Sequence, residues 1–303
     1  MEELIQIKAR RHPDWIKIRL PYGEKYEKVK SLVKTNRIHT ICEEAKCPNL
    51  AECWSHGTAT FLILGDMCTR YCAYCNVKTG KPLKLDLEEP KKVADAVGKL
   101  NLRYVVITSV TRDDLIDGGA SIYAETSKEI RKLNPNCSIE LLVPDFKIRS
   151  GKILREGYLN FDALKKVVDA KPDVLAHNIE AVRRVFARVR QGGNYDVSLE
   201  LLRKTKEINP NMKTKSSIML GFDETFDEVK ETMQDLIDNN VDFLTLGQYL
   251  QPSTIHAKIE KYYKPEEFEE LKKIGYELGF KNVEAGPLVR SSYRADKLNA
   301  LIK

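Results

Sequence analysis

The chain has 303 residues, a net charge of +6, 42% hydrophobic residues and 31% charged residues. This length allows one barrel-sized domain or two smaller ones, with enough apolar residues for a large core. No apolar run approaches the roughly 20 residues that span a bilayer, and the interrupted, partly acidic start does not match an export or organellar targeting signal, so we expect a cytoplasmic protein with no membrane segment.

Residues 1–59 precede the first predicted strand and are expected to form an N-terminal extension. Residues 1–40 carry ten Lys or Arg against five Asp or Glu. This excess indicates either a solvated surface or a basic arm that steers an acidic partner. Because no block of five or six like charges and no recognition motif occurs, no nucleic-acid partner is expected.

From residue 60 onward, β-rich apolar runs alternate with amphipathic stretches whose apolar residues recur every three or four positions. The predicted strands are 60–66, 104–110, 138–144, 173–180, 214–220 and 242–250. The predicted helices between them are 89–100, 124–133, 161–168, 195–208 and 227–239. Repeated β-then-α units predict a parallel sheet covered by helices, either a doubly wound open sheet or a barrel.

Polar segments at the strand ends favour the barrel, because barrels place their chemistry on the loops at the carboxyl ends of the strands. Six strands in place of eight predict a partial (β/α)6 TIM-like barrel over residues 60–250. Residues 251–303 form a C-terminal extension that begins with a helix over 265–279. We expect the N- and C-terminal extensions to lie over the barrel mouth.

Six of the seven cysteines fall within residues 42–75, in two groups of three. Clustered thiols in a large chain without an export signal indicate metal binding rather than a disulfide framework. Cys137 stands apart and is expected to be an ordinary buried thiol. In the second group, Cys68, Cys72 and Cys75 have the spacing C-x3-C-x2-C directly after the first predicted strand.

Three thiolates on a 4Fe–4S cube leave one iron with an open coordination position, because such a cube normally takes one thiolate per iron. This motif in this position resembles the radical S-adenosylmethionine (SAM) superfamily. The resemblance implies that the open iron binds the amino and carboxylate groups of SAM, whose reductive cleavage yields a 5′-deoxyadenosyl radical. Hard chemistry of this kind belongs to the cofactors, which the protein orients and shields.

The first group, Cys42, Cys47 and Cys53, has the spacing C-x4-C-x5-C, and His56 follows three residues after Cys53. Local spacing alone leaves a structural zinc site with His56 as an alternative. Together the two groups, "ITSVTRDDLIDGGA", "HNIE", "LGQYLQPS" and "AGPLVRSSYRAD" resemble the lipoyl synthase family. That resemblance implies a second, auxiliary 4Fe–4S cluster held by this first group and by the oxygen of Ser292.

The resemblance also implies contacts to SAM. Asn178, Glu180 and Arg190 are expected to hold its methionine end, since a carboxylate suits an ammonium and a guanidinium suits a carboxylate. Tyr74 is expected near the adenine, and Ser109 and Thr111 are candidate polar contacts. His177 is expected to be structural. The stretch 147–160 is longer than the family pattern predicts.

The implied reaction inserts sulfur at C6 and C8 of an octanoyl chain that is attached to a lysine of a lipoyl carrier domain, with the auxiliary cluster as the sulfur source. The carrier would be of the 2-oxoacid dehydrogenase E2 or glycine cleavage H protein type, and the electron donor ferredoxin- or flavodoxin-like. Rival interpretations are a sulfur-inserting enzyme of the biotin synthase or methylthiotransferase type, and an iron–sulfur electron carrier without enzymatic activity.

Overall fold

A computed structural model describes residues 12–302 except 19, 21, 57 and 151–152, and the side chains of 148–157 are not described. Its main sheet has the strand order β1-β2-β5-β6-β9-β10-β11-β12. All neighbours pair in parallel except β1 (His39–Thr40), which is antiparallel to β2. The parallel strands are β2 (Thr60–Ile63), β5 (Tyr104–Ser109), β6 (Ser138–Leu142), β9 (Val174–Ala176), β10 (Lys213–Leu220), β11 (Phe243–Gln248) and β12 (Asn282–Gly286).

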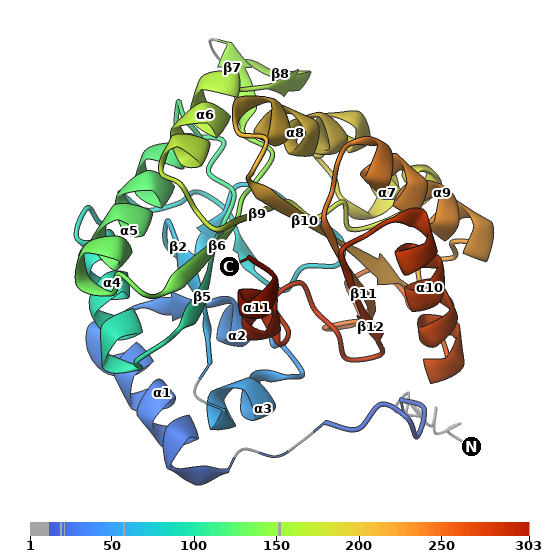
Figure 1. Cartoon of the computed structure of the whole chain (residues 1–303), viewed down its shortest axis with the longest axis horizontal. Helices are drawn as coiled ribbons and strands as arrows, with labels where there is room; N and C mark the ends of the chain where they lie inside the picture. The colour runs from blue at the N-terminus through green and yellow to red at the C-terminus, as the bar shows by residue number, and fades with distance from the viewer. Residues whose placement is uncertain (1–11, 19, 21, 57, 151–152, 303) are drawn as a thin grey trace, which may run out of the picture.

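Helices form an outer ring around this curved sheet, as Figure 1 shows. Each carries apolar residues on one face, which pack on the sheet and leave the charged face to solvent. The ring helices are α4 (Glu89–Lys99), α5 (Ala120–Leu133), α6 (Phe161–Asp169), α7 (Arg183–Val189), α8 (Tyr195–Ile208), α9 (Phe226–Asp238) and α10 (Pro265–Leu278). The predicted partial barrel is therefore confirmed, and six predicted strands match six observed ones.

The structure adds a seventh parallel strand, β12, which pairs with β11 from within the predicted C-terminal extension. In the described part of the chain, β1 and β12 are the two edges of the sheet and do not pair with each other. The barrel is thus open along one side. The N-terminal helices are α1 (Gly23–Asn36), α2 (Ile41–Glu44) and α3 (Leu50–Ser55).

The C-terminal extension lies at the barrel mouth only in its first part. Residues 289–292 follow β12 and line the cavity at the carboxyl ends of the strands. Beyond them, η1 (Ala295–Leu298) and α11 (Asn299–Ile302) pack near the opposite ends, where Ala295 and Leu298 contact Tyr104 and Val174, the first residues of β5 and β9. The tail therefore runs along the barrel from its mouth to its base.

Two small sheets complete the fold. β3 (Met67–Cys68) pairs with β4 (Lys78–Thr79), and this pairing brackets the segment that carries the second cysteine group. β7 (Lys147–Ser150) and β8 (Ile153–Leu159) form an antiparallel hairpin from the stretch that was longer than expected. The hairpin lies at the periphery in Figure 1.

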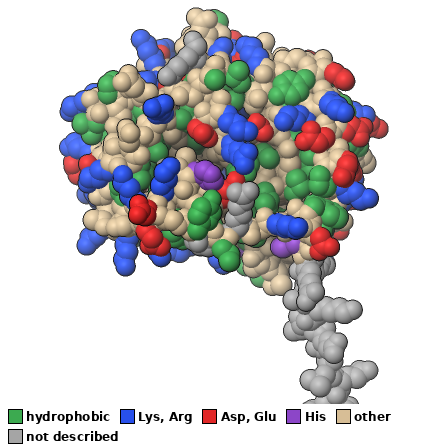
Figure 2. All heavy atoms as spheres, turned by 60° about the horizontal axis from the view of Figure 1, so that its bottom comes forward, with side chains coloured by type: hydrophobic (Ala, Val, Ile, Leu, Met, Phe, Trp, Pro, Cys, Tyr) green, Lys and Arg blue, Asp and Glu red, His purple; other side chains and the backbone are tan. Residues whose placement is uncertain are grey.

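The described surface shows mixed charge and no membrane-spanning helix. On the face in Figure 2, basic and acidic side chains are interspersed, so no single-sign patch dominates it. Among the described residues, no helix is both long and apolar enough to cross a bilayer. The first eleven residues of the predicted basic arm lie outside the described residues.

Candidate active site

The two cysteine groups meet in a cavity at the carboxyl ends of the parallel strands. This cavity measures about 480 Å³ and receives residues from six strand ends and from both extensions. The predicted site residues that line it are Cys42, Cys47, Cys68, Cys72, Cys75, Tyr74, Ser109, Thr111, Asn178, Glu180, Arg190 and Ser292. The remaining one, Cys53, lines an adjoining cavity of about 40 Å³ together with Cys42, Cys47 and Ser292.

The cysteine loop, residues 68–75, is fixed by backbone contacts on both sides. The Cys68 sulfur accepts N–H groups of Arg70 and Thr111, each at 3.4 Å. The Ala73 N–H donates to the Val189 carbonyl, and the Ala73 carbonyl accepts the Ala257 N–H, both at 2.8 Å. Helix α7 and the segment after β11 therefore hold the loop against the rim.

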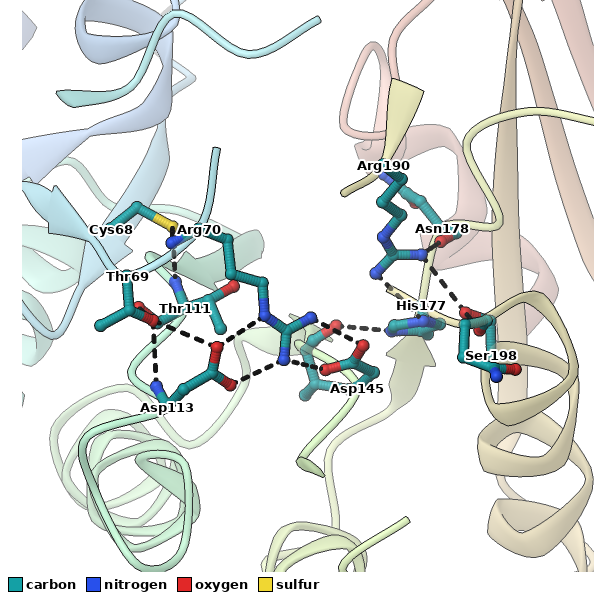
Figure 3. Close-up of polar contacts among 12 residues, drawn as sticks. Cys68, Thr69, Arg70, Thr111, Asp113, Asp145, His177, Asn178, Arg190 and Ser198 are labelled. Carbon is teal, nitrogen blue, oxygen red and sulfur yellow. Dashed lines mark hydrogen bonds and ion pairs between the residues drawn. The ribbon is translucent and has the colours of Figure 1, made fainter. Parts of the chain in front are cut away.

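Arg70 anchors the same loop through one buried and one partly buried carboxylate, as Figure 3 shows. Its Nε and Nη2 atoms donate to the Asp113 carboxylate, both at 2.7 Å. Its Nη1 and Nη2 atoms donate to the Asp145 carboxylate at 2.7 and 2.6 Å. Thr69 Oγ1 adds a bond to Asp113. These forked contacts tie the loop to the ends of β5 and β6, because Asp113 and Asp145 follow those strands.

Arg190 lies across the cavity and is oriented by the end of β9 (Figure 3). Its Nη1 atom donates to the Asn178 carbonyl at 2.7 Å, and its Nη2 atom lies 3.3 Å from His177 Nε2. The pKa of His177 is lowered to about 3, mainly by burial and in smaller part by the charge of Arg190. The ring is therefore neutral: Nδ1–H donates to the Val143 carbonyl at 2.8 Å, and Nε2 accepts from Arg190. This is the structural role expected for His177.

Three more predicted residues form a polar group beside Arg190. Asn178 Nδ2 donates to Glu180 Oε1 at 3.1 Å, and the Tyr74 hydroxyl contacts Glu180 and Cys72. Burial raises the pKa of Glu180, while the charge of Arg190 opposes that rise. Glu180 has φ of 72°, a conformation uncommon for a residue other than glycine, and such local strain clusters at functional sites.

Two buried oxygens that line the larger cavity have no hydrogen-bond partner within the described part of the protein. They are Ser109 Oγ and Asn178 Oδ1. Buried polar atoms are normally satisfied, so such orphans indicate a ligand or water. An amino-acid ligand fits here, because its ammonium would donate to the Asn178 oxygen and the Glu180 carboxylate. The donor set therefore suits the methionine end of SAM.

The first cysteine group lies at the open side of the barrel. Cys42 is in α2, Cys53 is in α3, and Cys47 lies between them with its N–H bonded to the Cys42 carbonyl at 2.9 Å. The pKa of Cys42 and of Cys53 is raised to about 12, mainly by burial and in smaller part by neighbouring thiols of the group. Three thiols that disfavour each other's charge need a cation to become thiolates, which a metal centre supplies.

Ser292 shares the smaller cavity with these three thiols, and the tail that carries it is bonded to the same segment. Asn49 Nδ2 donates to the Leu288 carbonyl, and the Tyr293 hydroxyl donates to Glu52 at 3.0 Å. The residues present therefore fit a cluster with three sulfur ligands and one oxygen ligand.

The zinc alternative finds no support in the geometry. Among the described residues, no group of three or more His, Cys, Asp or Glu is arranged to hold one metal ion. His56 Nδ1 lies 2.7 Å from the Glu52 carbonyl at the end of α3, and its ring does not line either cavity. A polynuclear cluster needs ligands that stand farther apart than those of one zinc ion, whose sulfur ligands lie about 2.3 Å from the metal.

Several residues at the site were not predicted from the sequence. Asp113 and Asp145 belong to the polar strand ends, but nothing local identifies Arg70 as their partner. His256 Nε2 lies 3.0 Å from the Cys75 carbonyl and attaches the segment after β11 to the cysteine loop. Arg290 lines both cavities beside Ser292. Its place in the "VRSSY" segment is the one signal that could have drawn attention to it.

Comparisons with known proteins show which families this sequence and fold resemble. The sequence profile of the radical SAM superfamily matches residues 62–236, and that of the N-terminal domain of lipoyl synthase matches residues 3–47. Lipoyl synthases of Bacillus velezensis and Bacillus subtilis are each 53% identical over 288 residues, covering 95% of this chain and 93% of the relative. The crystal structure of methylornithine synthase is similar in fold, with a TM-score of 0.53 and 13% identity over 86% of this chain and 79% of that chain.

Proposed function

The chain belongs to the lipoyl synthase family of the radical SAM superfamily, and from this membership we propose how its residues divide the work of that enzyme. The family uses SAM and a 4Fe–4S cluster and acts on protein-bound octanoyl groups. The proposed reaction is the insertion of two sulfur atoms, at C6 and C8 of an octanoyl-lysine. The observation that carries the proposal is the meeting of both cysteine groups and Ser292 at one cavity system.

The second cysteine group would hold the cluster that binds SAM. When bound, that cluster and SAM supply the radical that removes hydrogen from an unactivated carbon. The chain's own contribution is to hold Cys68, Cys72 and Cys75 on a loop tied to the rim, and to offer Asn178 and Glu180 to the SAM ammonium. Arg190, oriented by His177, faces the same ligand and would attract its carboxylate.

The first cysteine group and Ser292 would hold the auxiliary cluster as the sulfur source. An alkoxide is a hard donor and matches iron in a sulfur-rich cluster less well than thiolate does, so Ser292 should release first. Apolar residues of the larger cavity offer a place for an eight-carbon chain between the two groups. These are Ile41, Val77, Val110, Leu142, Met219 and Val289.

The finer assignments of partners and location are part of the same proposal. The carrier would be an E2 or H-protein type lipoyl domain, the electron donor a ferredoxin or flavodoxin, and the location the cytoplasm. On α1, Lys25, Lys28 and Lys30 are exposed and available to an acidic carrier. Reversing their charge should slow turnover on carrier protein but not on a short octanoyl-lysine peptide. Equal slowing of both substrates would contradict the steering role.

The central test is the anaerobic reconstitution of the wild type and of a Cys42/Cys47/Cys53 triple alanine variant, with iron and sulfide determined for each. We expect two cubes to fall to one, SAM cleavage to be retained, and lipoyl product to be lost. Cys137→Ala is the matched control, since Cys137 is buried but lines neither cavity. Unchanged iron in the triple variant would contradict the assignment.

A further inference from the structure

Arg290 is placed at the boundary of the two cavities by a close backbone contact. It follows β12 and lines both the larger cavity and the smaller one. The preceding residue, Val289, lies against Gly247 of β11, where an added Cβ would come within 2.0 Å of the Val289 carbonyl oxygen. Because glycine has no side chain there, the tail approaches the sheet and Arg290 reaches the site.

The guanidinium of Arg290 is poorly satisfied. Its Nη1 atom donates one hydrogen bond to the Val289 carbonyl at 2.7 Å, and no carboxylate of the described residues pairs with it. Arg70 and Arg112 at the same rim, and Arg294 in the same tail, each have a carboxylate partner. A guanidinium has five N–H donors, and a partly buried charge without a counter-ion is costly. Arg290 therefore lacks an anion.

The residues that share the smaller cavity with Arg290 identify where that anion belongs. The smaller cavity places Arg290 among Cys42, Cys47, Cys53 and Ser292. The anion is thus expected on the side of the first cysteine group.

We propose that Arg290 is a charge-compensating residue for the auxiliary cluster, because it lines the smaller cavity together with the proposed ligands of that cluster. This inference rests on the proposed assignment of Cys42, Cys47, Cys53 and Ser292. A thiolate-bound cluster carries negative charge, and charges or hydrogen bonds near its sulfurs set its stability and potential. A fixed cation that cannot lose its proton should slow the loss of iron from the cluster and ease its reduction.

The experiment uses full-length chains in a Cys68/Cys72/Cys75 triple alanine background, which would retain only the auxiliary cluster. Arg290→Gln, Arg290→Lys and Arg184→Gln are compared after anaerobic reconstitution. The readouts are iron and sulfide content, the rate of iron loss to an added chelator, and a reductive titration followed by electron paramagnetic resonance. Arg184→Gln is the matched control, because it removes the same charge from an exposed side chain that pairs with Glu228 and lines neither cavity.

We expect Arg290→Gln to lose iron about tenfold faster or more, the usual range for outer-shell partners of a metal site, and to be harder to reduce. Arg290→Lys should stay near the parent, since it keeps the charge, and Arg184→Gln should match the parent. Failure of Arg290→Gln to assemble, with Arg290→Lys assembling normally, supports the same conclusion.

Iron loss and reduction unchanged in Arg290→Gln would overturn the inference while leaving the cluster assignment intact. A parent background that takes up no cluster would overturn both together. The remaining possibility is that Arg290 pairs with SAM. It is tested by titrating SAM into a chain whose only change is Arg290→Gln. If SAM affinity falls while the auxiliary cluster is unaffected, the anion of Arg290 is the cofactor and the inference is wrong.

Discussion

Neutralising Asp145 should weaken the fold and, selectively, the loop that carries the second cysteine group. Asp145 is fully buried, and both of its oxygens accept from Arg70, at 2.6 and 2.7 Å. The change Asp145→Asn keeps the size of the side chain but removes its charge. It leaves the Arg70 guanidinium with Asp113 as its only carboxylate partner among the described residues.

The size of the effect follows from the pKa of this carboxyl. Burial alone would raise it, but the Arg70 guanidinium outweighs burial and lowers the pKa from 3.8 to about 2. At about 1.4 kcal/mol per unit, this corresponds to about 2.5 kcal/mol of folding free energy. Breaking a buried ion pair by removing one partner costs about 3–5 kcal/mol. We therefore expect Asp145→Asn to lower the free energy of unfolding by about 3 kcal/mol at neutral pH.

The sign of the pH dependence is fixed by the direction of this shift. A carboxyl whose pKa is lower in the folded state stabilises the fold above its unfolded pKa. That contribution is lost as the pH falls from near 4 towards about 2. The variant should therefore differ most from the wild type at neutral pH and converge with it in acid.

Urea unfolding of the metal-free proteins measures the decrease in the free energy of unfolding. Glu140→Gln provides the control. Glu140 is equally buried on β6 and accepts Lys215 Nζ at 2.9 and 3.0 Å, but it does not line the cavity. Both variants should lose stability. Only Asp145→Asn should also lower the iron held by the second cysteine group, assayed with the first group replaced by alanine. Wild-type stability in Asp145→Asn, or equal iron loss in both variants, would refute this reasoning.

Three further changes test the site. Ser292→Cys should retain the auxiliary iron but lower lipoyl product several-fold, because thiolate holds iron more firmly than alkoxide. Formation of lipoyl product at the wild-type rate, measured by mass spectrometry, would contradict this. Glu180→Gln should weaken SAM binding about tenfold, because it removes one charge-assisted contact of about 1.4 kcal/mol. An unchanged dissociation constant for SAM in an equilibrium titration would remove Glu180 from the proposed SAM site. Gly247→Ala should displace the tail at Val289 and lower the content of auxiliary iron. Gly286→Ala should not, because its added Cβ meets Val289 at an ordinary 3.4 Å. Similar iron contents in the two variants would argue against the close approach of the tail to Gly247 as the explanation.

The barrel could be predicted because its elements carry their own signals. Strand β5 at Tyr104–Ser109 was expected at 104–110, since a buried strand between two amphipathic helices is a nearly continuous apolar run. Helix α10 begins at Pro265 and ends before Gly279, as the proline and glycine positions predicted. Local composition was sufficient in these segments because packing and propensity agree there.

Elements that depend on distant partners were not predicted. Strand β12 has one buried residue, Val283, and owes its conformation to pairing with β11 rather than to an apolar pattern. The position of η1 at the base of the barrel is not indicated by its local sequence either. Its two buried residues, Ala295 and Leu298, find their contacts on strands that are far away in the sequence.

The same distinction separates the ligands from the residues around them. Cysteine spacing identifies candidate ligands because it is a short-range pattern, so the second group could be placed on a loop after the first strand. The counter-ions come from separate rim loops: Arg70 and Asp145 are 75 positions apart, and the loops that carry them are adjacent only because β2, β5 and β6 are neighbours. A single sequence contains no measure of that proximity.

The open side of the barrel explains how two metal centres can share one substrate cavity. A closed barrel of eight strands fills its interior with side chains. Here the sheet ends at β1 on one side and β12 on the other, and the segments that follow those edges carry Cys42 and Ser292. The contacts from Asn49 to Leu288 and from Tyr293 to Glu52 join these segments across the gap. The four proposed auxiliary ligands therefore come from the two ends of the chain, so this centre should assemble only after the barrel has folded, whereas the cysteine loop at the rim depends on the barrel alone.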